Sequence, residues 1–374
     1  MTAATIVPVS LFMSIDTGGS SWQLAFSDGL GRRVRQRRVN AGDLAQVALE
    51  VDEAKTRLGL EASATVWSGY EAGHEGFWLH RELSTMGVQS LVIDPASVQV
   101  SRKSKQAKTD RLDARALLSA LVRWVGGDHL ACKPIRIPGP EAEDDRHLHR
   151  EIRVLQKEMQ AHMSRLRALL GVHGHRGVKR KELKAIIDGG KGPTGVEFLP
   201  RLKARLAREY KRLLVAEKQL DELRKQQREE VKNPGSAATQ MVKRLCELKG
   251  IGVVSAWILV MEFFAWRDFK NRREVGAAAG LTGTPHASDG SSWDKGVSKS
   301  GNKEVRRLMI ELSWLWLRYQ PGAKRTLWYR RKWGTGSKRL RRVGIVALSR
   351  ALLVDIWHWV EHGVVPEGAL IKAS

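Results

Sequence analysis

Short apolar runs alternate with amphipathic stretches over the first part of the chain. Apolar runs at 11–16 and 21–27 and a charged run (RRVRQRRV) at 32–39 predict three strands joined by Gly-containing turns. Three strands followed by alternating helices and strands are typical of an α/β domain with a mixed sheet, which we place at residues 1–128. The later elements predicted in it are helices at 44–58, 77–83 and about 110–125, and strands at 64–73 and 90–95.

A Gly- and Pro-rich segment at 126–140 predicts a linker after this domain. Beyond it, apolar residues recur every three or four positions from 148 to 169 and again from 199 to 223, and the other positions are mostly charged. This periodicity predicts two long amphipathic helices. We interpret residues 141–232 as an antiparallel coiled-coil hairpin.

Residues 240–374 predict a mainly helical third domain, interrupted by a Gly/Ser-rich loop at 280–302. Near its start, CELKGIGVVSAWILVMEF (246–263) places two glycines in a turn between helical patterns. The turn is typical of a helix-hairpin-helix, whose exposed backbone N–H groups can hold a phosphate. An ordinary helix–helix turn would use glycine in the same way, so both interpretations stay open.

The balance of charge narrows the class of partner. The formal net charge is +24, with 42% hydrophobic and 28% charged residues, which favours a polyanion such as nucleic acid. A membrane surface is the competing explanation, but we find no apolar run near the roughly 18 residues that a transmembrane helix needs, and no signal peptide. Two cysteines without a CxxC pair argue against a zinc ribbon or a disulfide scaffold and favour the cytoplasm.

Four acidic residues stand where a site of an α/β domain would form. Asp16 and Glu71 each end a predicted strand, and Asp110 and Asp113 are three apart at a helix start. Each has an ordinary explanation: Asp16 as a turn residue before Gly, Glu71 as a solvated acid, and the other two as acids at a helix N-terminus capped by Thr109. Together, however, they predict a cluster that needs cations.

Hard oxygen ligands select Mg²⁺, with Mn²⁺ as the alternative. Two such ions can activate an attacking oxygen and stabilise a leaving one at a phosphodiester, as in ribonuclease H-like nucleases. A rival interpretation is that SIDTGGSSWQLAF (14–26) is the first phosphate loop of an actin-like or sugar-kinase ATPase. The second phosphate loop and the adenosine loop of that fold have no convincing counterpart in the sequence.

Basic residues accompany the candidate site and the C-terminal region, and residues 323–342 interleave them with aromatic ones, a combination typical of single-strand or RNA binding. The residues predicted to bind nucleic acid are Arg102, Lys103, Lys105, Lys108, Lys299, Asn302, Arg306, Lys324, Arg325, Trp328, Arg330, Arg331, Lys332, Lys338 and Arg339. The serines of the loop at 280–302 (Ser288, Ser291 and Ser292) are nucleophile candidates without a neighbouring His-Asp pair.

Five stretches, taken in order, resemble the transposases of the insertion-sequence 110/1111 family, and more closely the 1111 branch. They are YEAGHEGFWLHREL, VIDPASVQVSRKSKQAKTDRLDARAL, LKGIGVVSAWIL, AAAGLTGTPHASDGSSWDKGVSKSGNKEVRRLMIELSWLWLRYQP and KRLRRVGIVALSRALL. The resemblance spans roughly residues 12 to 370. It implies a RuvC-like (ribonuclease H-like) N-terminal domain with an Asp-Glu-Asp-Asp tetrad, a coiled-coil dimerisation segment, and a C-terminal domain that supplies a catalytic serine.

Carried over to this sequence, the tetrad falls on Asp16, Glu71, Asp110 and Asp113, and the nucleophile on Ser288. The family's serine is followed directly by glycine, whereas Asp289 intervenes here, which keeps Ser291 as an alternative. The resemblance also implies a guide (bridge) RNA that pairs with donor and target DNA.

The expected reaction is RNA-guided recombination by a homodimer or tetramer, through a covalent phosphoserine, with composite sites across protomers. The alternatives are a Mg²⁺-dependent, structure-selective nuclease that uses water, a non-catalytic nucleic-acid-binding protein, and an ATPase.

Overall fold

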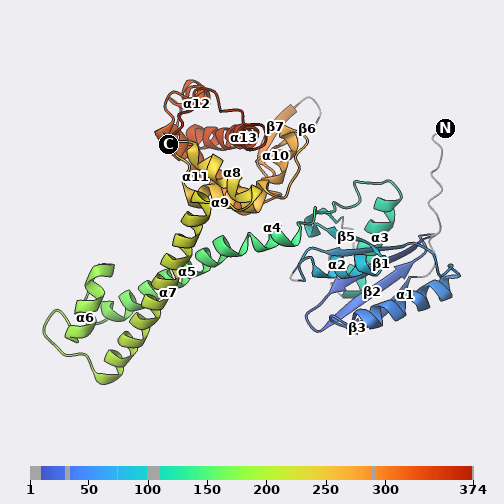
Figure 1. Ribbon diagram of the computed structural model, residues 1–374, viewed down its shortest axis with the longest axis horizontal. Helices are drawn as coiled ribbons and strands as arrows, with labels where there is room; N and C mark the ends of the chain where they lie inside the picture. Colours follow the sequence, from blue (N-terminus) through green and yellow to red (C-terminus); the bar gives the residue numbers. More distant parts are fainter. Residues whose placement is uncertain (1–9, 30–33, 74, 99–109, 289–290, 373–374) are drawn as a thin grey trace. The chain divides into compact units, whose positions relative to one another are not determined.

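The computed structural model describes the chain except for residues 1–9, 30–33, 74, 99–109, 289–290 and 373–374 (Figure 1). The chain forms two compact units, Met1–Ile137 and Pro138–Ser374. The predicted separation of the second unit into a hairpin domain and a C-terminal domain remains a prediction.

A five-stranded mixed sheet forms the centre of the first unit. Its strands are β1 (Leu11–Thr17), β2 (Ser21–Ser27), β3 (Arg35–Asn40), β4 (Val66–Glu71) and β5 (Gln89–Ile93). They lie in the order β3-β2-β1-β4-β5; β2 pairs antiparallel with both β1 and β3, β4 pairs parallel with β1, and β5 pairs parallel with β4. The predicted α/β class and mixed sheet are therefore confirmed.

Alternate side chains of the strands pack in two apolar clusters, one on each face of the sheet. Leu11, Met13 and Ile15 of β1 are fully buried in one cluster with residues of α1 (Leu44–Leu58) and α2 (Trp78–Thr85). Phe12, between them, packs in a different cluster with residues of α3 (Asp110–Val125). Because successive side chains of a strand point to opposite faces, α3 covers one face of the sheet, and α1 and α2 cover the other.

Two long antiparallel helices begin the second unit (Figure 1). They are α5 (His147–Gly171), preceded by α4 (Pro140–Asp144), and α7 (Pro200–Lys232). Ile152 near the start of α5 packs with Leu220, whereas Leu166 near its end packs in one cluster with Leu206, so the helices run in opposite directions. The segment between them contains η3 (Arg180–Glu182) and α6 (Leu183–Gly189).

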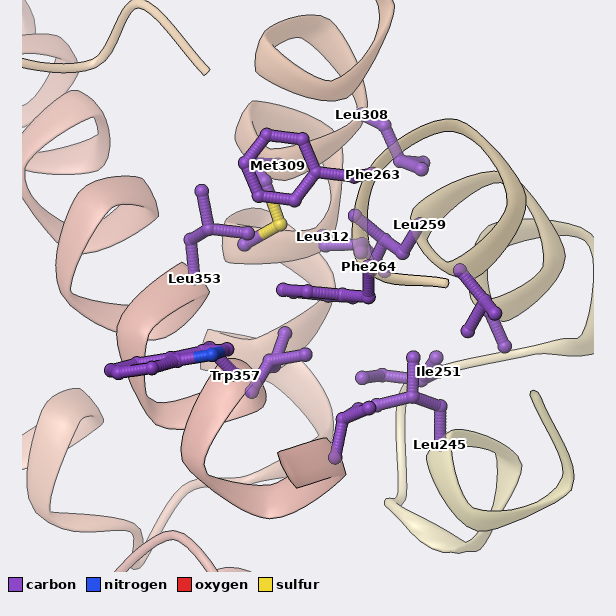
Figure 2. Packing of buried hydrophobic residues seen from close by; sticks show 14 of the residues in the cluster. Leu245, Ile251, Leu259, Phe263, Phe264, Leu308, Met309, Leu312, Leu353 and Trp357 are labelled. Carbon is purple, nitrogen blue, oxygen red and sulfur yellow. The ribbon is translucent and has the colours of Figure 1, made fainter. Parts of the chain in front are cut away.

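The remaining helices, apart from the one at Lys324–Trp333, enclose an apolar core (Figure 2). The helices of this region are α8 (Ala237–Glu247), α9 (Val253–Leu259), the π-helical turn η4 (Val260–Phe264), α10 (Arg272–Ala278), α11 (Lys303–Tyr319), α12 (Lys324–Trp333) and α13 (Lys338–His362). Figure 2 shows Phe263 and Phe264 pointing towards α11 residues such as Met309 and α13 residues such as Leu353 and Trp357, with which they share one cluster. The mainly helical character of this region is confirmed.

The expectation that no apolar run approaches transmembrane length was wrong for α13. This 25-residue helix is long and apolar enough, by length and composition alone, to cross a membrane. Its apolar residues instead supply the centre of the core, where Leu352, Leu353 and Ile356 are fully buried. A core helix that is contacted on several sides is apolar around much of its circumference. This explains why α13 resembles a membrane-spanning helix in length and composition.

The segment at 280–302, predicted as a loop, contains a hairpin. Strand β6 (Gly283–Ser288) pairs antiparallel with β7 (Ser291–Val297). In the sequence, Asp289-Gly290 separates the two strands, and an Asp-Gly pair is a strong hairpin signal. The prediction of a loop followed from the Gly and Ser content of the segment. It was wrong for the residues of β6 and β7.

A buried ion network fixes the start of α5 against η4. Glu262 is 5% exposed and accepts hydrogen bonds from Arg150 (Nε, 2.7 Å; Nη2, 2.9 Å), and its Oε1 lies 2.9 Å from His149 Nε2. Burial alone would raise the pKa of Glu262, but the hydrogen bonds with His149 and Arg150 outweigh burial and lower this pKa to about 2. The carboxylate therefore stays charged inside the protein.

Replacement Glu262→Gln is expected to remove a pH-dependent part of the stability. Because the folded-state pKa lies below the unfolded one, the carboxylate stabilises the protein above the unfolded pKa, and this stabilisation is lost as pH falls from about 5 towards 2. Thermal unfolding followed by circular dichroism should show a steeper loss of the free energy of unfolding over this range in the wild type than in the variant, by on the order of 2–3 kcal/mol.

The control is Glu229→Gln, which alters an exposed i,i+3 partner of Lys232 and should show the same pH dependence as the wild type. Equal pH profiles for all three proteins would refute the assignment.

Candidate active site

Two of the predicted acids end neighbouring parallel strands. The parallel register pairs Ile15 of β1 with Tyr70 of β4, so the next residues, Asp16 and Glu71, stand at matching positions one strand apart. Neighbouring strands are about 4.8 Å apart, which brings the two acids within reach of a single small cation. Asp16 is partly buried and Glu71 is exposed.

Both acids belong to the face of the sheet that α3 covers. Ser14, two residues before Asp16, donates a hydrogen bond from Oγ to the Ala114 carbonyl of α3 at 2.6 Å. Gly69, two residues before Glu71, lies beneath α3, where an added Cβ would be in van der Waals contact with Leu121 at 3.5 Å. Residues two apart in a strand share a face, so Asp16 and Glu71 continue the rows begun by Ser14 and Gly69.

The contacts of α3 with three strands show its course over the sheet. Ala114 contacts Ser14 of β1, the Arg111 carbonyl accepts a hydrogen bond from Gln36 Nε2 of β3 at 2.8 Å, and Leu121 lies beside Gly69 of β4. The helix therefore crosses the strands obliquely, with its first turn on the β3 side and its later turns over β4. The first turn carries Asp110 and Asp113.

The spacing of the buried residues of α3 places the two aspartates on the side of the helix that faces the sheet. Ala114, Leu117 and Leu121 are buried against the sheet and recur at helical spacing. Asp110 and Asp113 stand four residues before Ala114 and Leu117, so they extend the same stripe by one turn. Asp113 is exposed; the position of Asp110 is described but not its side chain, and Thr109, the predicted cap, lies outside the described residues.

Contacts that the sequence did not reveal hold the backbone that follows Glu71. The Tyr70 hydroxyl donates to the Gly76 carbonyl (3.0 Å) and accepts from the His80 backbone N–H (3.2 Å). The Glu75 carboxylate accepts from the indole N–H groups of Trp22 (3.3 Å) and Trp78 (3.0 Å). These contacts join residues up to 53 positions apart, and no local pattern signals them.

The donor set fits a hard divalent cation, because carboxylate oxygens are the ligands that Mg²⁺ and Mn²⁺ prefer. Among the described side chains, which do not include that of Asp110, no group of three or more His, Cys, Asp or Glu is arranged to hold a metal ion. The structure thus brings Asp16 and Glu71 to matching ends of neighbouring strands, on the face that α3 covers. The complete tetrad remains a prediction.

The two candidate serines face each other in the hairpin of the second unit. Ser288, the last residue of β6, pairs in register with Ser291, the first residue of β7. The structure describes the backbone of both residues but not their side chains. Their equivalent positions do not distinguish the two nucleophile candidates.

The residues after this hairpin anchor it to the helices. Asn302 caps α11 by accepting hydrogen bonds from the backbone N–H groups of Glu304 (3.0 Å) and Val305 (3.1 Å). Arg306 donates to the Ala279 carbonyl at 3.1 Å. Asn302 and Arg306 therefore make structural contacts at positions predicted to bind nucleic acid, while Lys299 is exposed, with a positive φ of 57°.

The basic–aromatic region divides into paired and exposed residues. Lys324 pairs with Glu367, and Arg325 forms two hydrogen bonds with Asp355 (2.6 and 2.7 Å). The other basic residues predicted here, all exposed, are Arg330, Arg331, Lys332, Lys338 and Arg339. The ion-paired residues are less suited than these to phosphate contact.

The aromatic residues of α12, which were predicted to stack on nucleic-acid bases, pack partly against other apolar residues. The rings of Trp328 and Trp333 meet edge to face at 4.8 Å, and both indoles contact the core that Ile345 and Leu348 form. Trp333 lies so close to Gly344 of α13 that an added Cβ would stand 2.6 Å from its ring. The basic run Arg102, Lys103, Lys105 and Lys108 lies outside the described residues.

Comparison with known proteins gives consistent similarities. A family model described as the transposase IS116/IS110/IS902 family matches residues 242–327. The chain is 35% identical over 387 residues to y4rJ of Sinorhizobium fredii, which is named as a transposase, and the match covers 99% of this chain and 97% of that protein. It is 28% identical to the transposase for insertion sequence element IS1328 of Yersinia enterocolitica (66% and 70% covered) and 25% identical to that for IS1111A of Coxiella burnetii (84% and 81% covered).

Two buried serines provide a matched test of how α3 is held over the sheet. Ser14→Ala should cost about 1–2 kcal/mol of stability, because it leaves the buried Ala114 carbonyl without its donor. Ser68→Ala, on the neighbouring strand β4, should be neutral or slightly stabilising, because Ser68 Oγ is buried with no hydrogen-bond partner among the described residues. Thermal unfolding measures both. Equal effects of the two substitutions would show that the Ser14–Ala114 contact does not hold the helix.

Proposed function

Because this chain belongs to the IS110/IS1111 family of insertion-sequence transposases, we propose that it cuts and rejoins DNA through a serine nucleophile aided by metal-binding carboxylates. The observation that carries the proposal is the position of Asp16 and Glu71, each one residue beyond the Ile15–Tyr70 pair of β1 and β4. The helix α3, whose first turn carries Asp110 and Asp113, covers the same face of the sheet.

The arrangement of strands supports a ribonuclease H-like, RuvC-like fold for the first unit. Three antiparallel strands followed by two strands parallel to the first form the β3-β2-β1-β4-β5 sheet, and acids stand at the carboxyl ends of its parallel strands, where sites of such sheets collect. In the second unit, the antiparallel packing of α5 and α7 supports the proposed coiled-coil hairpin.

Asp16, Glu71, Asp110 and Asp113 are the residues that would hold Mg²⁺ or Mn²⁺. Bound there, the ions would supply Lewis-acid stabilisation of charge on the phosphodiester oxygens. The packing of α3 against Ser14 and Gly69 limits the freedom of both strand acids and of the helix start. Such pre-organisation is what a metal-binding set requires of the surrounding protein.

Ser288 is the proposed nucleophile. Its Oγ forms a new bond to the scissile phosphorus, the bond from phosphorus to the leaving sugar oxygen breaks, and the serine proton is transferred so that the departing oxygen leaves as a hydroxyl. The DNA strand is then joined to the protein as a phosphoserine. Attack by a sugar hydroxyl of another strand reverses these changes, releases the serine and joins new DNA without ATP, because the ester bond is conserved.

The proposed partners are donor DNA, target DNA and a guide RNA, with the protein acting as a homodimer or tetramer. The net charge of +24 and the exposed basic residues of α12 and the first turn of α13 support phosphate binding. The helix–turn–helix of α8 and α9, joined through Gly250 and Gly252, is a second candidate phosphate contact. The second candidate function, hydrolysis by water at the same carboxylates, needs no serine and leaves no covalent product.

Ser288→Ala is expected to abolish covalent protein–DNA adducts. The protein is expressed in cells that carry a plasmid with the element's own ends and flanking sequence. Adducts are collected under denaturing conditions and detected by labelled DNA that remains with the protein. Ser291→Ala, its cross-strand neighbour, is the matched control and should keep at least a tenth of the wild-type signal, whereas Ser288→Ala should reduce it by more than about a hundredfold.

The other outcomes are equally informative. Loss of adducts only in Ser291→Ala would transfer the nucleophile to Ser291. Adducts in both variants would contradict a nucleophilic serine at either position. Cleavage by the wild type without any adduct would favour the water-dependent nuclease.

A further inference from the structure

A lateral row of polar residues crosses the sheet beside the carboxylate pair. The antiparallel registers pair Asp16 of β1 with Gln23 of β2, and Gln23 with Arg38 of β3. Residues that pair across neighbouring strands share a face of the sheet. Glu71, Asp16, Gln23 and Arg38 therefore form one row on the face that α3 covers, and this row ends in an arginine.

The arginines of β3 differ in their partners according to the face they occupy. Arg35 and Arg37 lie on the opposite face, where Glu50 of α1 forms ion pairs with both. Arg38 is exposed, and no described carboxylate forms an ion pair with it. Its Nε donates a hydrogen bond to Ser21 Oγ at 2.8 Å. The strand thus neutralises the arginines on one face and leaves the positive charge of Arg38 on the face of the candidate site.

The distance of Arg38 from Asp16 and the orientation of its guanidinium suit it to bind a phosphate beside the carboxylates. Two strand spacings separate it from Asp16, roughly 10 Å, which is too far for an ion pair. The hydrogen bond from Nε to Ser21 orients the guanidinium, and no described residue bonds to its two Nη groups. A guanidinium fork held in this way is suited to a phosphate, which accepts two parallel N–H bonds.

A surface depression of about 580 Å³ adjoins Arg38. Its polar lining includes Ser20, Ser21, Asn40 and Gln46, which offer hydroxyl and amide groups. It also includes Asp43, whose carboxylate caps α1 by accepting a hydrogen bond from the Gln46 backbone N–H at 2.9 Å. The groups around Arg38 can therefore supply further hydrogen bonds to an anion.

We propose that Arg38 and Ser21 form a phosphate subsite that binds the DNA strand next to the phosphate to be cut. The inference rests on the proposed function, since it takes Asp16 and Glu71 as the place of the reaction. A nucleic-acid strand that enters the carboxylate pair from the β3 edge of the sheet meets the exposed Arg38 with a neighbouring, uncleaved phosphate, because Gln23 between them is buried. Arg38 is a positioning residue: it holds the strand and leaves the reacting atoms to other groups.

The matched variants are Arg38→Gln and Arg37→Gln, which each remove one positive charge from adjacent positions on opposite faces of β3. Binding of a short DNA duplex to the full-length protein is measured by fluorescence anisotropy over a range of salt concentrations, without divalent cations. Arg38→Gln should weaken binding about tenfold at low salt and reduce the slope of log K against log salt by about 0.9, the value for one lost phosphate contact. Arg37→Gln should leave both quantities near the wild-type values, and Arg38→Lys should retain the slope.

Equal effects of the Arg37 and Arg38 substitutions would overturn the subsite, since only general charge would then matter. An RNA duplex of the same sequence provides a second arm: a loss confined to RNA would overturn the assignment to the DNA strand. Thermal unfolding confirms that each variant is folded. Because binding without divalent cations involves no cleavage, a failure of the serine mechanism leaves the binding result readable, and a failure of the subsite leaves the adduct assay unaffected.

Discussion

The parallel pairing of β1 and β4 is the constraint on which the candidate site depends. Its register puts Asp16 and Glu71 one strand apart on one face, and a shift by a single residue would send one of them to the opposite face. Close carboxylates repel by about 4 kcal/mol near a protein surface, so a protein that holds two of them together must surround them with a firm framework. The Ser14–Ala114 hydrogen bond and the packing of α3 over Gly69 provide that framework.

A second constraint acts in the helical unit, where Glu262 connects two parts of the chain. Its side chain binds His149 and Arg150 at the start of α5, and its backbone carbonyl accepts a hydrogen bond from the Asn302 side chain at 3.3 Å. Asn302 in turn caps α11, directly after the hairpin that carries Ser288. One buried residue thus ties the long helices to the anchor of the serine hairpin. This explains why Asn302, although predicted to bind nucleic acid, has a structural role here.

Local patterns were sufficient to predict most individual elements. The helices at 44–58 and 110–125 have the predicted bounds, β4 lies within its predicted strand, and β5 begins one residue before its predicted strand, because burial of one face leaves a clear periodicity. The predictions failed where tertiary packing decides: α13 is apolar because it is a core helix, and β6 and β7 form a hairpin in a segment whose composition resembles a loop. The site was predicted only in part, since contacts such as Ser14 with Ala114, 100 residues apart, leave no local signal. The alternation of paired and exposed arginines in β3 was equally hidden, because it depends on Glu50 of α1.

The central claim is that the ends of β1 and β4 and the start of α3 supply one metal-binding set. The most direct measurement is Mn²⁺ binding to the full-length protein, followed by electron paramagnetic resonance of the free ion. The account predicts that Asp16→Asn and Asp113→Asn each remove the tight Mn²⁺ binding of the wild type. Asp128→Asn, which alters an exposed acid paired with Arg123, should leave that binding intact. Unchanged Mn²⁺ binding in both site variants would contradict the account.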